Sequence, residues 1–473
     1  MEQNTHTSKK LSPRRIAGFA CNQGFVFFLF YMGLNRSFSF GPFSFERADL
    51  IVTLFFMAVG FLVINIVSTN TKKVLTARPI MLLYAFLFAS GSLIPYITGV
   101  QGNVGWLLLE GGCIGISCSL LLVSWGRAFG EVPTKISIPE VFIGSLLGAL
   151  FGLGVSFVPI PRTDLVFRIL PFVSAIALMV GSQPGFGLVS SRNFDNDSKQ
   201  SAALLSLKVL AGTALFGMAA GLMETFNTDP GMQAMPSYAI AFLLFAAFAV
   251  GVLSLLLSDG FGRGASLNKA YRIAILVLLT GFILVPAPFF AGSIVSGEAI
   301  VLAGYLSLSA VLISLFLVLA SITGISSLSS FSRGFAALFG GELLGVIVAN
   351  CLNSTQVEFA TPYTVVVLAA VLVMFSYIFL FTERDFDNLS EMVTDKDSFE
   401  NRCEAIIEKY GLSSREAEIL PFVLKGRTSE RISQELFISK STVDTHLRRI
   451  YGKVDVHSRQ ELIDISEKTS IKY

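Results

Sequence analysis

The sequence predicts an all-α protein in which a transmembrane helix bundle is followed by a small water-soluble helical domain. Of its 473 residues, 53% are hydrophobic and only 14% are charged, whereas soluble domains carry about 25% charged residues. Charge is also unevenly placed, because 15 Lys or Arg and 18 Asp or Glu fall within residues 383–473. These observations separate a membrane body from a polar tail.

The membrane body contains twelve apolar runs that are each about as long as a spanning helix, which needs about 20 residues. The runs are 16–35, 48–68, 79–99, 104–126, 138–158, 165–183, 203–226, 236–257, 271–292, 298–322, 333–352 and 361–382. The longest polar interruption, 190–201, lies between the sixth and seventh runs. We therefore predict a cytoplasmic segment at 1–15 and a membrane domain at 16–382, with halves at 16–183 and 203–382.

The distribution of basic residues supports this count. With the N-terminus in the cytoplasm, alternation of the twelve runs places fifteen of the Lys and Arg in residues 1–382 on the cytoplasmic side. The outer side receives only Arg36, Arg47, Arg162 and Arg168. Because cytoplasmic loops are enriched in Lys and Arg, we expect both termini inside a bacterial inner or plasma membrane.

Two features of the body concern packing and polar sites. Small residues at four-residue spacing, typical of close helix contacts, occur in the fifth and eleventh runs: Gly144, Gly148, Gly152, Gly341 and Gly345. Ionisable residues inside a bilayer are costly and are candidates for function. We take Glu110 and Glu342 as candidates for a ligand cavity, while Lys208 and Glu224, near the ends of the seventh run, are expected to extend to the membrane surface.

Twelve helices in two halves resemble the major facilitator superfamily. Asp259-Gly260-Phe261-Gly262-Arg263 resembles the Asp-x-x-Gly-Arg core of that family's cytoplasmic loop signature. The equivalent loop of the first half, 71–78, has the basic residues but neither the Asp nor the Gly. The resemblance therefore implies the fold and leaves transport open.

The sequence of the tail predicts an acidic linker with a lead-in helix at 383–410, followed by a helical domain at 411–473. Ser413 with Glu416, and Ser458 with Glu461, have the spacing of capping boxes at helix starts. Thr428 and Ser439 are positioned to cap two further helices that are joined by a short turn. Four short helices of which the middle pair is closely joined predict a helix-turn-helix module.

The third of these helices has one apolar and one polar face. Val443, Leu447 and Ile450 recur at helical spacing and are expected to face the core. The outward residues are Lys440, Ser441, Asp444, Thr445, Arg448 and Arg449. From Lys440 to Arg459 there are five basic and two acidic residues, a pattern typical of a helix that enters the major groove of DNA. A solvated charged face is the alternative interpretation.

The same stretch resembles the LuxR-type (NarL/FixJ) DNA-binding domain over about residues 411–467. The matching motifs are Leu412 to Glu416, Gly426, Leu436 to Ser439, Ser441 to Val443, Thr445 to Leu447 and Val456 to Arg459. The resemblance implies base contacts by Asp444, Thr445 and Arg448, and a dimer face that includes Leu462 and Ile465. It also implies phosphate contacts by Thr428, Lys440, Thr442, Arg449 and Lys453.

Two positions depart from that family. Asp444 stands where the family usually has Lys, and a carboxylate there repels phosphate but can accept a hydrogen bond from cytosine. Arg431 stands where Glu is common, which removes one capping box. The operator sequence should therefore differ from that of other members.

These patterns favour a membrane-bound transcription regulator whose bundle senses a small molecule and whose tail binds double-stranded DNA as a homodimer. The alternatives are a transporter with a regulatory tail, and a tail that only docks protein partners. The sequence contains no nucleophile motif and no phosphate-binding loop, and its 5 Cys and 3 His do not have the spacing of metal ligands. We therefore expect no enzymatic activity, no metal site and no cofactor.

Overall fold

The computed structural model divides the chain into two compact units, 1–388 and 389–473, whose boundary lies inside the predicted linker. The structure describes residues 11–32, 36–40, 43–67, 75–94, 104–155, 160–181, 196–224, 238–257, 263–286, 295–323, 325–353, 361–380, 382, 385, 399 and 402–469. The two units are described separately below. Residues 259–262 of the loop motif and residues 71–74 of the equivalent loop lie outside the described residues.

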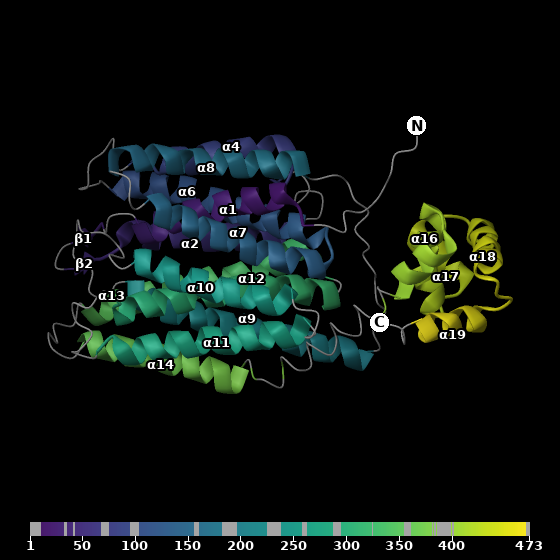
Figure 1. The fold of residues 1–473 in the computed structure, drawn as a ribbon. Helices are drawn as coiled ribbons and strands as arrows, with labels where there is room; N and C mark the ends of the chain where they lie inside the picture. Colours follow the sequence, from purple (N-terminus) through teal and green to yellow (C-terminus); the bar gives the residue numbers. More distant parts are fainter. Residues whose placement is uncertain are drawn as a thin grey trace. The chain divides into compact units, whose positions relative to one another are not determined.

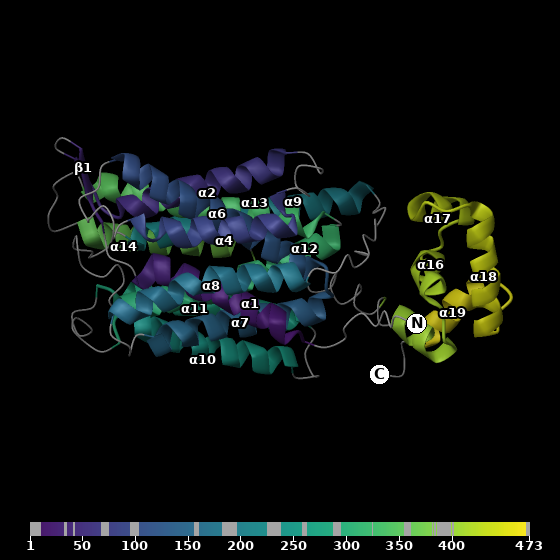
Figure 2. The ribbon, with the colours of Figure 1, turned by 90° about the horizontal axis from the view of Figure 1, so that it is seen from above.

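The first unit is a bundle in which long helices lie side by side (Figures 1 and 2). Its first half contains α1 (Pro13–Phe27) with the π-helical η1 (Phe28–Met32), α2 (Ala48–Ile66), α4 (Arg78–Gly91), α6 (Val104–Gly130), α7 (Thr134–Val155) and α8 (Ile160–Gly181). Its second half contains α9 (Asn196–Glu224), α10 (Tyr238–Leu257), α11 (Arg263–Leu284), α12 (Gly297–Thr323), α13 (Ser327–Asn353) and α14 (Thr361–Phe375) with η3 (Ser376–Leu380). A helix therefore coincides with each predicted apolar run.

Within the described residues, nine of these helices are long and apolar enough to cross a membrane. The helices α4 and α8 contribute the shorter apolar stretches Pro79–Gly91 and Phe167–Val180. Helix α1 is cut to 15 residues because its hydrogen bonding changes to the π pattern at Phe28. A multi-pass membrane bundle is thus established, and twelve spans remain a prediction.

The expectation of a purely helical chain needs one correction. Strands β1 (Phe38–Phe40) and β2 (Phe43–Phe45) pair antiparallel, with Phe38 opposite Phe45. Each strand reads Phe-Ser-Phe, an alternation typical of a strand with one apolar face. The segment is short and lies between two long apolar runs, so hydrophobicity at the length of a spanning helix does not predict it.

The contacts between helices repeat in the two halves. Helix α1 packs against α7, and the corresponding first helix of the second half, α9, packs against α13. Between the halves, α2 contacts α13 and α7 contacts α10. Helices α2 and α10 are each the second helix of their half, and α7 and α13 are each the fifth. Exchanging the halves therefore converts the α2–α13 contact into the α10–α7 contact, as expected for a duplicated six-helix unit.

The predicted glycine positions lie at these contacts. On α7, a Cβ at Gly144 would approach Phe19, and one at Gly148 would meet the backbone of α1. On α13, a Cβ at Gly341 or Gly345 would lie about 2 Å from a carbonyl oxygen of α9. The approach of α9 to α13 is therefore too close for any side chain, and the packing interpretation of these glycines is confirmed.

The second unit consists of α16 (Ser414–Leu424), α17 (Ser429–Leu436), α18 (Lys440–Val454) and α19 (Arg459–Thr469), preceded by a helix at 402–410. Its hydrophobic core contains side chains from all of these helices. The buried members are Cys403, Ile406, Ile419, Leu420, Val423, Ile432, Val443, Leu447, Ile450, Val454, Val456 and Leu462. Because Cys403 and Ile406 complete this core, the folded domain begins before residue 411.

Candidate nucleic-acid interface and buried charge pairs

A tight turn joins α17 to α18. It begins at Phe437, whose φ of 53° is left-handed, and the N–H of Ile438 returns to the carbonyl of Ser433 at 3.1 Å. The turn ends at Ser439, whose hydroxyl accepts a hydrogen bond from the N–H of Thr442 at 3.1 Å. This is the helix-turn-helix connection that the sequence predicts.

Helix α18 has the predicted inner and outer faces. Val443 and Ile450 are fully buried and Leu447 nearly so. On the opposite face the exposed side chains are Lys440, Ser441, Thr445, Arg448 and Arg449, and Asp444 is half-buried. Among the described residues, neither Arg448 nor Arg449 forms an ion pair. Two guanidinium groups are therefore available to an anionic partner along one face of α18.

Hydroxyl groups gather where α18 begins. Ser439 Oγ lies 2.8 Å from Ser441 Oγ and 2.7 Å from Thr442 Oγ1, and Thr428 Oγ1 caps α17 by accepting from the N–H of Arg431 at 3.3 Å. Helix N-termini and exposed hydroxyls are the usual partners of phosphate oxygens. The predicted phosphate contacts Thr428, Lys440 and Thr442 are all exposed at this end of the two helices.

Lys453 has a role that the sequence did not indicate. Its ammonium donates to Glu416 Oε2 at 2.7 Å and to the carbonyl of Gly411 at 3.0 Å. Glu416 also accepts from the N–H of Ser413 at 2.7 Å, completing the predicted capping box. Burial alone would raise the pKa of Glu416, but Lys453 and the Ser413 N–H outweigh it and hold that pKa below its usual range. Two of the three donors of Lys453 thus serve the domain itself.

The predicted dimer face must be corrected at Leu462. This side chain is fully buried in the domain core, and Ile465 is half-buried against the same core. Ser458 Oγ accepts from the N–H of Glu461 at 3.2 Å as expected, but the Glu461 carboxylate accepts from His457, one residue before the predicted partner. The apolar pattern of α19 reflects core packing, which sequence periodicity cannot distinguish from an interface.

In the bundle, Glu110 forms a buried ion pair with Arg36. Arg36 Nη2 also lies 3.6 Å from Asp49 Oδ2. One further oxygen on each acid, Glu110 Oε2 and Asp49 Oδ1, is buried without a hydrogen-bond partner among the described residues. Two acids therefore share one guanidinium group between η1, α2 and α6.

Glu224 was expected to extend to the membrane surface, and this expectation is wrong. Its side chain is 3% exposed and its Oε2 lies 2.6 Å from Nη1 of Arg47, which is 2% exposed. Arg47 Nη2 also donates to the carbonyl of Phe30 at 2.9 Å. Because Arg47 precedes α2 and Glu224 ends α9, this ion pair joins the two halves.

Glu342 is also buried, at 1% exposure, and accepts from the Tyr305 hydroxyl at 2.8 Å. Both residues lie in the second half, on α13 and α12. Glu342 is within electrostatic range of Glu224 and Arg47. The candidate cavity residue Glu342 thus belongs to a polar cluster with Arg47 and Glu224, and these residues are too far apart in the sequence for the cluster to be predicted.

Lys208 contacts the beginning of the tail. Its ammonium lies 3.0 and 3.3 Å from the two carboxylate oxygens of Asp385, and its side chain is 46% exposed. Asp385 also accepts from the N–H and hydroxyl of Thr382 at 3.1 and 2.8 Å. Burial would raise the pKa of Asp385, but Lys208 and Thr382 outweigh it and lower that pKa.

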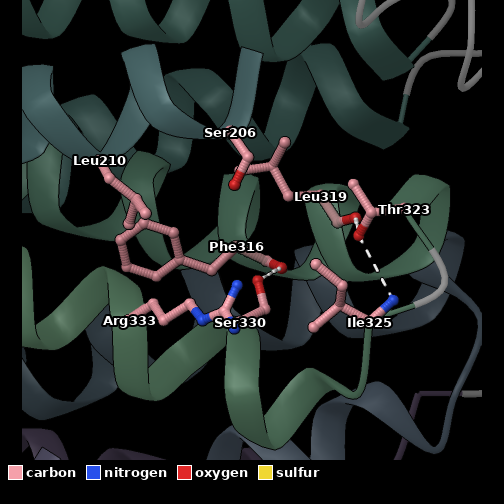
Figure 3. A pocket seen from close by; sticks show the side chains of 8 residues that line it. All are labelled: Ser206, Leu210, Phe316, Leu319, Thr323, Ile325, Ser330 and Arg333. Atoms are coloured by element: carbon pink, nitrogen blue, oxygen red, sulfur yellow. Dashed lines mark hydrogen bonds between the residues drawn. The ribbon is translucent and has the colours of Figure 1, made fainter. Parts of the chain in front are cut away.

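A small recess in the second half is lined by eight side chains from α9, α12, α13 and the connection between the last two (Figure 3). They are Ser206, Leu210, Phe316, Leu319, Thr323, Ile325, Ser330 and Arg333. The Ser330 hydroxyl donates to the carbonyl of Phe316 at 2.8 Å, which closes one side. The space holds about one water molecule, so it is not a site for an organic ligand. Within the described residues, no group of three or more His, Cys, Asp or Glu is arranged to hold a metal ion.

Comparison with known proteins identifies the tail. Residues 411–466 match the family of bacterial regulatory proteins, luxR family, and form a LuxR-type helix-turn-helix domain. An uncharacterized response regulatory protein of Escherichia coli, YgeK, is 40% identical over 84 residues, 17% of this chain and 57% of that protein. The oxygen regulatory protein NreC of Staphylococcus haemolyticus is 40% identical over 60 residues, and the fimbriae Z protein of E. coli is 41% identical over 56. The chain spans 28% and 27% of these two relatives.

Solved structures that are similar to this chain include two transporters. The transporter FucP of the major facilitator superfamily, in its outward conformation, is 15% identical with a TM-score of 0.44, covering 77% of this chain and 97% of that one. A bacterial homologue of the iron transporter ferroportin, in its outward-facing state, is 12% identical with a TM-score of 0.46, covering 80% and 98%.

Proposed function

We propose that this protein is a membrane-held, one-component transcription regulator that binds double-stranded DNA through residues 399–469. The observation that carries the proposal is the outer face of α18, where Arg448 and Arg449 are exposed without ion-pair partners among the described residues. A regulator of this kind needs no enzymatic activity, and we propose none.

Within this proposal, α18 enters the major groove. Asp444, Thr445 and Arg448 read base edges, since Arg pairs well with guanine and a carboxylate can accept from cytosine. Thr428, Lys440, Thr442 and Arg449 hold phosphates on either side of the groove. Lys453 contributes to the phosphate contacts only with the donor that Glu416 and Gly411 leave unused.

Binding as a dimer follows from the size of the domain. A single helix reads only a few base pairs, and two linked domains on adjacent half-sites add their binding free energies. Because Leu462 is in the core, a dimer contact through α19 would have to use its half-buried Ile465 and the neighbouring exposed polar residues. We propose that dimerisation accompanies DNA binding.

We propose that the bundle supplies the input by binding a small molecule between its halves. Glu110 and Glu342 belong to buried polar clusters on different halves, and the Arg47–Glu224 ion pair joins those halves. A ligand that favours one arrangement of the halves would shift the population of DNA-binding states. The positive-inside distribution supports a cell-membrane location with both termini in the cytoplasm.

A transporter with a regulatory tail is the second candidate, because the exchangeable α2–α13 and α7–α10 contacts are suited to movement of one half against the other. Uptake of the ligand into vesicles that depends on Glu342 would favour it. The regulator proposal predicts ligand-dependent DNA occupancy without uptake.

The direct experiment measures binding of fragment 395–473 to DNA from upstream of its own coding sequence. Arg448→Ala should weaken binding at least tenfold, whereas Arg415→Ala, an exposed arginine on α16 that pairs with Glu418, should not. Equal loss in both variants, or the absence of binding at moderate salt, would reject the DNA-binding proposal.

A further inference from the structure

The buried charges of the bundle do not balance. Among the described residues, Asp49, Glu110, Glu224 and Glu342 provide four carboxylates, and Arg36 and Arg47 provide the two cations close to them. Three of the four carboxylates are more than nine-tenths buried. A buried carboxylate is stable only when protonated or paired with a cation. The four carboxylates thus outnumber the two cations that lie near them.

The unpaired part of the cluster lies around Glu342. Glu342 accepts a hydrogen bond from the uncharged hydroxyl of Tyr305, and the nearby guanidinium of Arg47 is already bound to Glu224. Tyr31 is fully enclosed beside the same three charged residues. Two carboxylates with two tyrosines around them form the kind of surface that binds an organic ammonium ion, through ion pairing and contact with aromatic faces.

Arg47 is held in this site at a cost. Its backbone has a φ of 52°, a left-handed conformation that side-chain-bearing residues seldom adopt, and its side chain caps no helix. Its guanidinium reaches Glu224 and the carbonyl of Phe30 at the π-helical turn η1. Of the two carboxylates Glu224 and Glu342, Arg47 thus pairs with Glu224, as a bound ammonium ion would.

We propose that Glu224, Glu342, Tyr305 and Tyr31 form a binding site for an organic ammonium ion, and that Arg47 is the resident competitor for it. When the ligand binds, its ammonium group pairs with Glu224 and Glu342, and Arg47 is displaced. The ion pair between α2 and α9 is then lost. This inference rests on the proposed sensing function and specifies the chemical class of its ligand.

The consequence for the bundle follows from α9. Within its apolar stretch Leu205–Glu224, α9 carries Lys208 near the beginning and Glu224 at the end, and packs Gly217 and Gly221 against α13 between them. Lys208 holds Asp385, at the beginning of the tail. Loss of the Arg47 contact would therefore release the end of an apolar stretch whose beginning holds Asp385 through Lys208.

The test uses the full chain in lipid nanodiscs and follows the thermal unfolding midpoint with phenethylammonium as probe. A ligand that binds only the folded state raises this midpoint. Its neutral analogue 2-phenylethanol controls for apolar binding. We expect the ammonium alone to raise the midpoint of the wild type, and its apparent affinity to fall at least tenfold in Glu224→Gln and in Glu342→Gln.

Removal of the competitor gives the decisive comparison. Arg47→Ala should bind phenethylammonium at least tenfold more tightly than the wild type, and Arg47→Gln, which keeps a donor for Phe30, serves if the alanine variant does not fold. Glu140→Gln is the matched control, because Glu140 is an equally buried carboxylate that pairs with Arg15 at 2.7 Å on α1. The Glu140→Gln variant should bind phenethylammonium with the same affinity as the wild type.

The proposal is overturned if neither Arg47 variant binds the ammonium more tightly than the wild type, or if 2-phenylethanol binds equally well. Failure of the sensing function would look different. An ammonium that binds as described but leaves DNA occupancy of the full chain unchanged would reject sensing and retain the site. DNA binding by fragment 395–473 is independent of both outcomes.

Discussion

The ammonium of Lys453, in the last turn of α18, lies 2.7 Å from the carboxylate of Glu416, in the first turn of α16. The Glu416 side chain is 3% exposed, and Lys453 is its cationic partner. The pair therefore connects the helix proposed to read DNA to the first helix of the domain. Removing one partner leaves a buried charge with fewer hydrogen bonds.

The first prediction concerns this pair. Lys453→Met in fragment 395–473 keeps the aliphatic stem and removes the charge, so it should lower the free energy of unfolding by about 1–3 kcal/mol. Denaturation in urea measures it. Lys440→Met is the control, because Lys440 is 60% exposed and 4.0 Å from Glu430, and its effect should stay within about 0.5 kcal/mol. Equal effects of the two changes would contradict a structural role for Lys453.

The second prediction concerns pH. Because the pKa of Glu416 is lowered in the folded domain, its contribution to stability is complete above the pKa of an unfolded Glu, about 4.3. It is lost as the pH falls from there through the lowered folded value. Glu416→Gln should therefore reduce the slope of stability against pH below about pH 4.5. An unchanged slope in this variant would show that other carboxylates account for the acid sensitivity.

The sequence predicted the tail in detail because its signals are local. Capping residues act on N–H groups three positions away, and the period of Val443, Leu447 and Ile450 defines a buried face without knowledge of the rest of the chain. The same locality explains the error at Leu462. An apolar residue on a helix surface has the same periodicity whether it faces its own core or a partner.

The charge pairs of the bundle could not be predicted in this way, because their partners are far apart in the sequence. Glu224 and Arg47 are separated by 177 positions, and only the packing of α2 and α9 against α13 brings them together. One signal was nevertheless present. Arg36 and Arg47 are two of the four basic residues that the positive-inside rule places on the outer side, and both pair with carboxylates of the bundle.

The third prediction concerns Asp444. Asp444→Lys introduces a positive charge on the outer face of α18, so the affinity for phosphate should increase for every DNA sequence. The slope of log binding constant against log salt should become steeper by about 1. Titrations of fragment 395–473 at several salt concentrations measure it. A gain confined to one DNA sequence would instead indicate that position 444 only reads bases.

The fourth prediction concerns the contact between α9 and α13. A Cβ at Gly221 would lie 2.0 Å from the carbonyl oxygen of Glu342, so Gly221→Ala forces the two backbones apart and should cost about 1–3 kcal/mol. Gly340→Ala is the matched control, because a Cβ there meets no atom within 4 Å. Thermal unfolding of the full chain in nanodiscs should show a lower midpoint for Gly221→Ala alone.

The fifth prediction concerns the turn before α18, where Phe437 is 95% exposed and left-handed. A non-glycine residue pays about 1–2 kcal/mol for this conformation, and an exposed ring regains little by packing. Phe437→Gly removes that cost. It also adds conformational freedom to the unfolded chain, which lowers stability by about 0.5–1 kcal/mol. We therefore expect the free energy of unfolding to increase by up to about 1 kcal/mol. Asp455→Gly, at φ 61°, should gain less, since Asp tolerates the left-handed region better. Destabilisation by Phe437→Gly in urea denaturation of fragment 395–473 would mean that the ring stabilises the folded domain, despite its exposure.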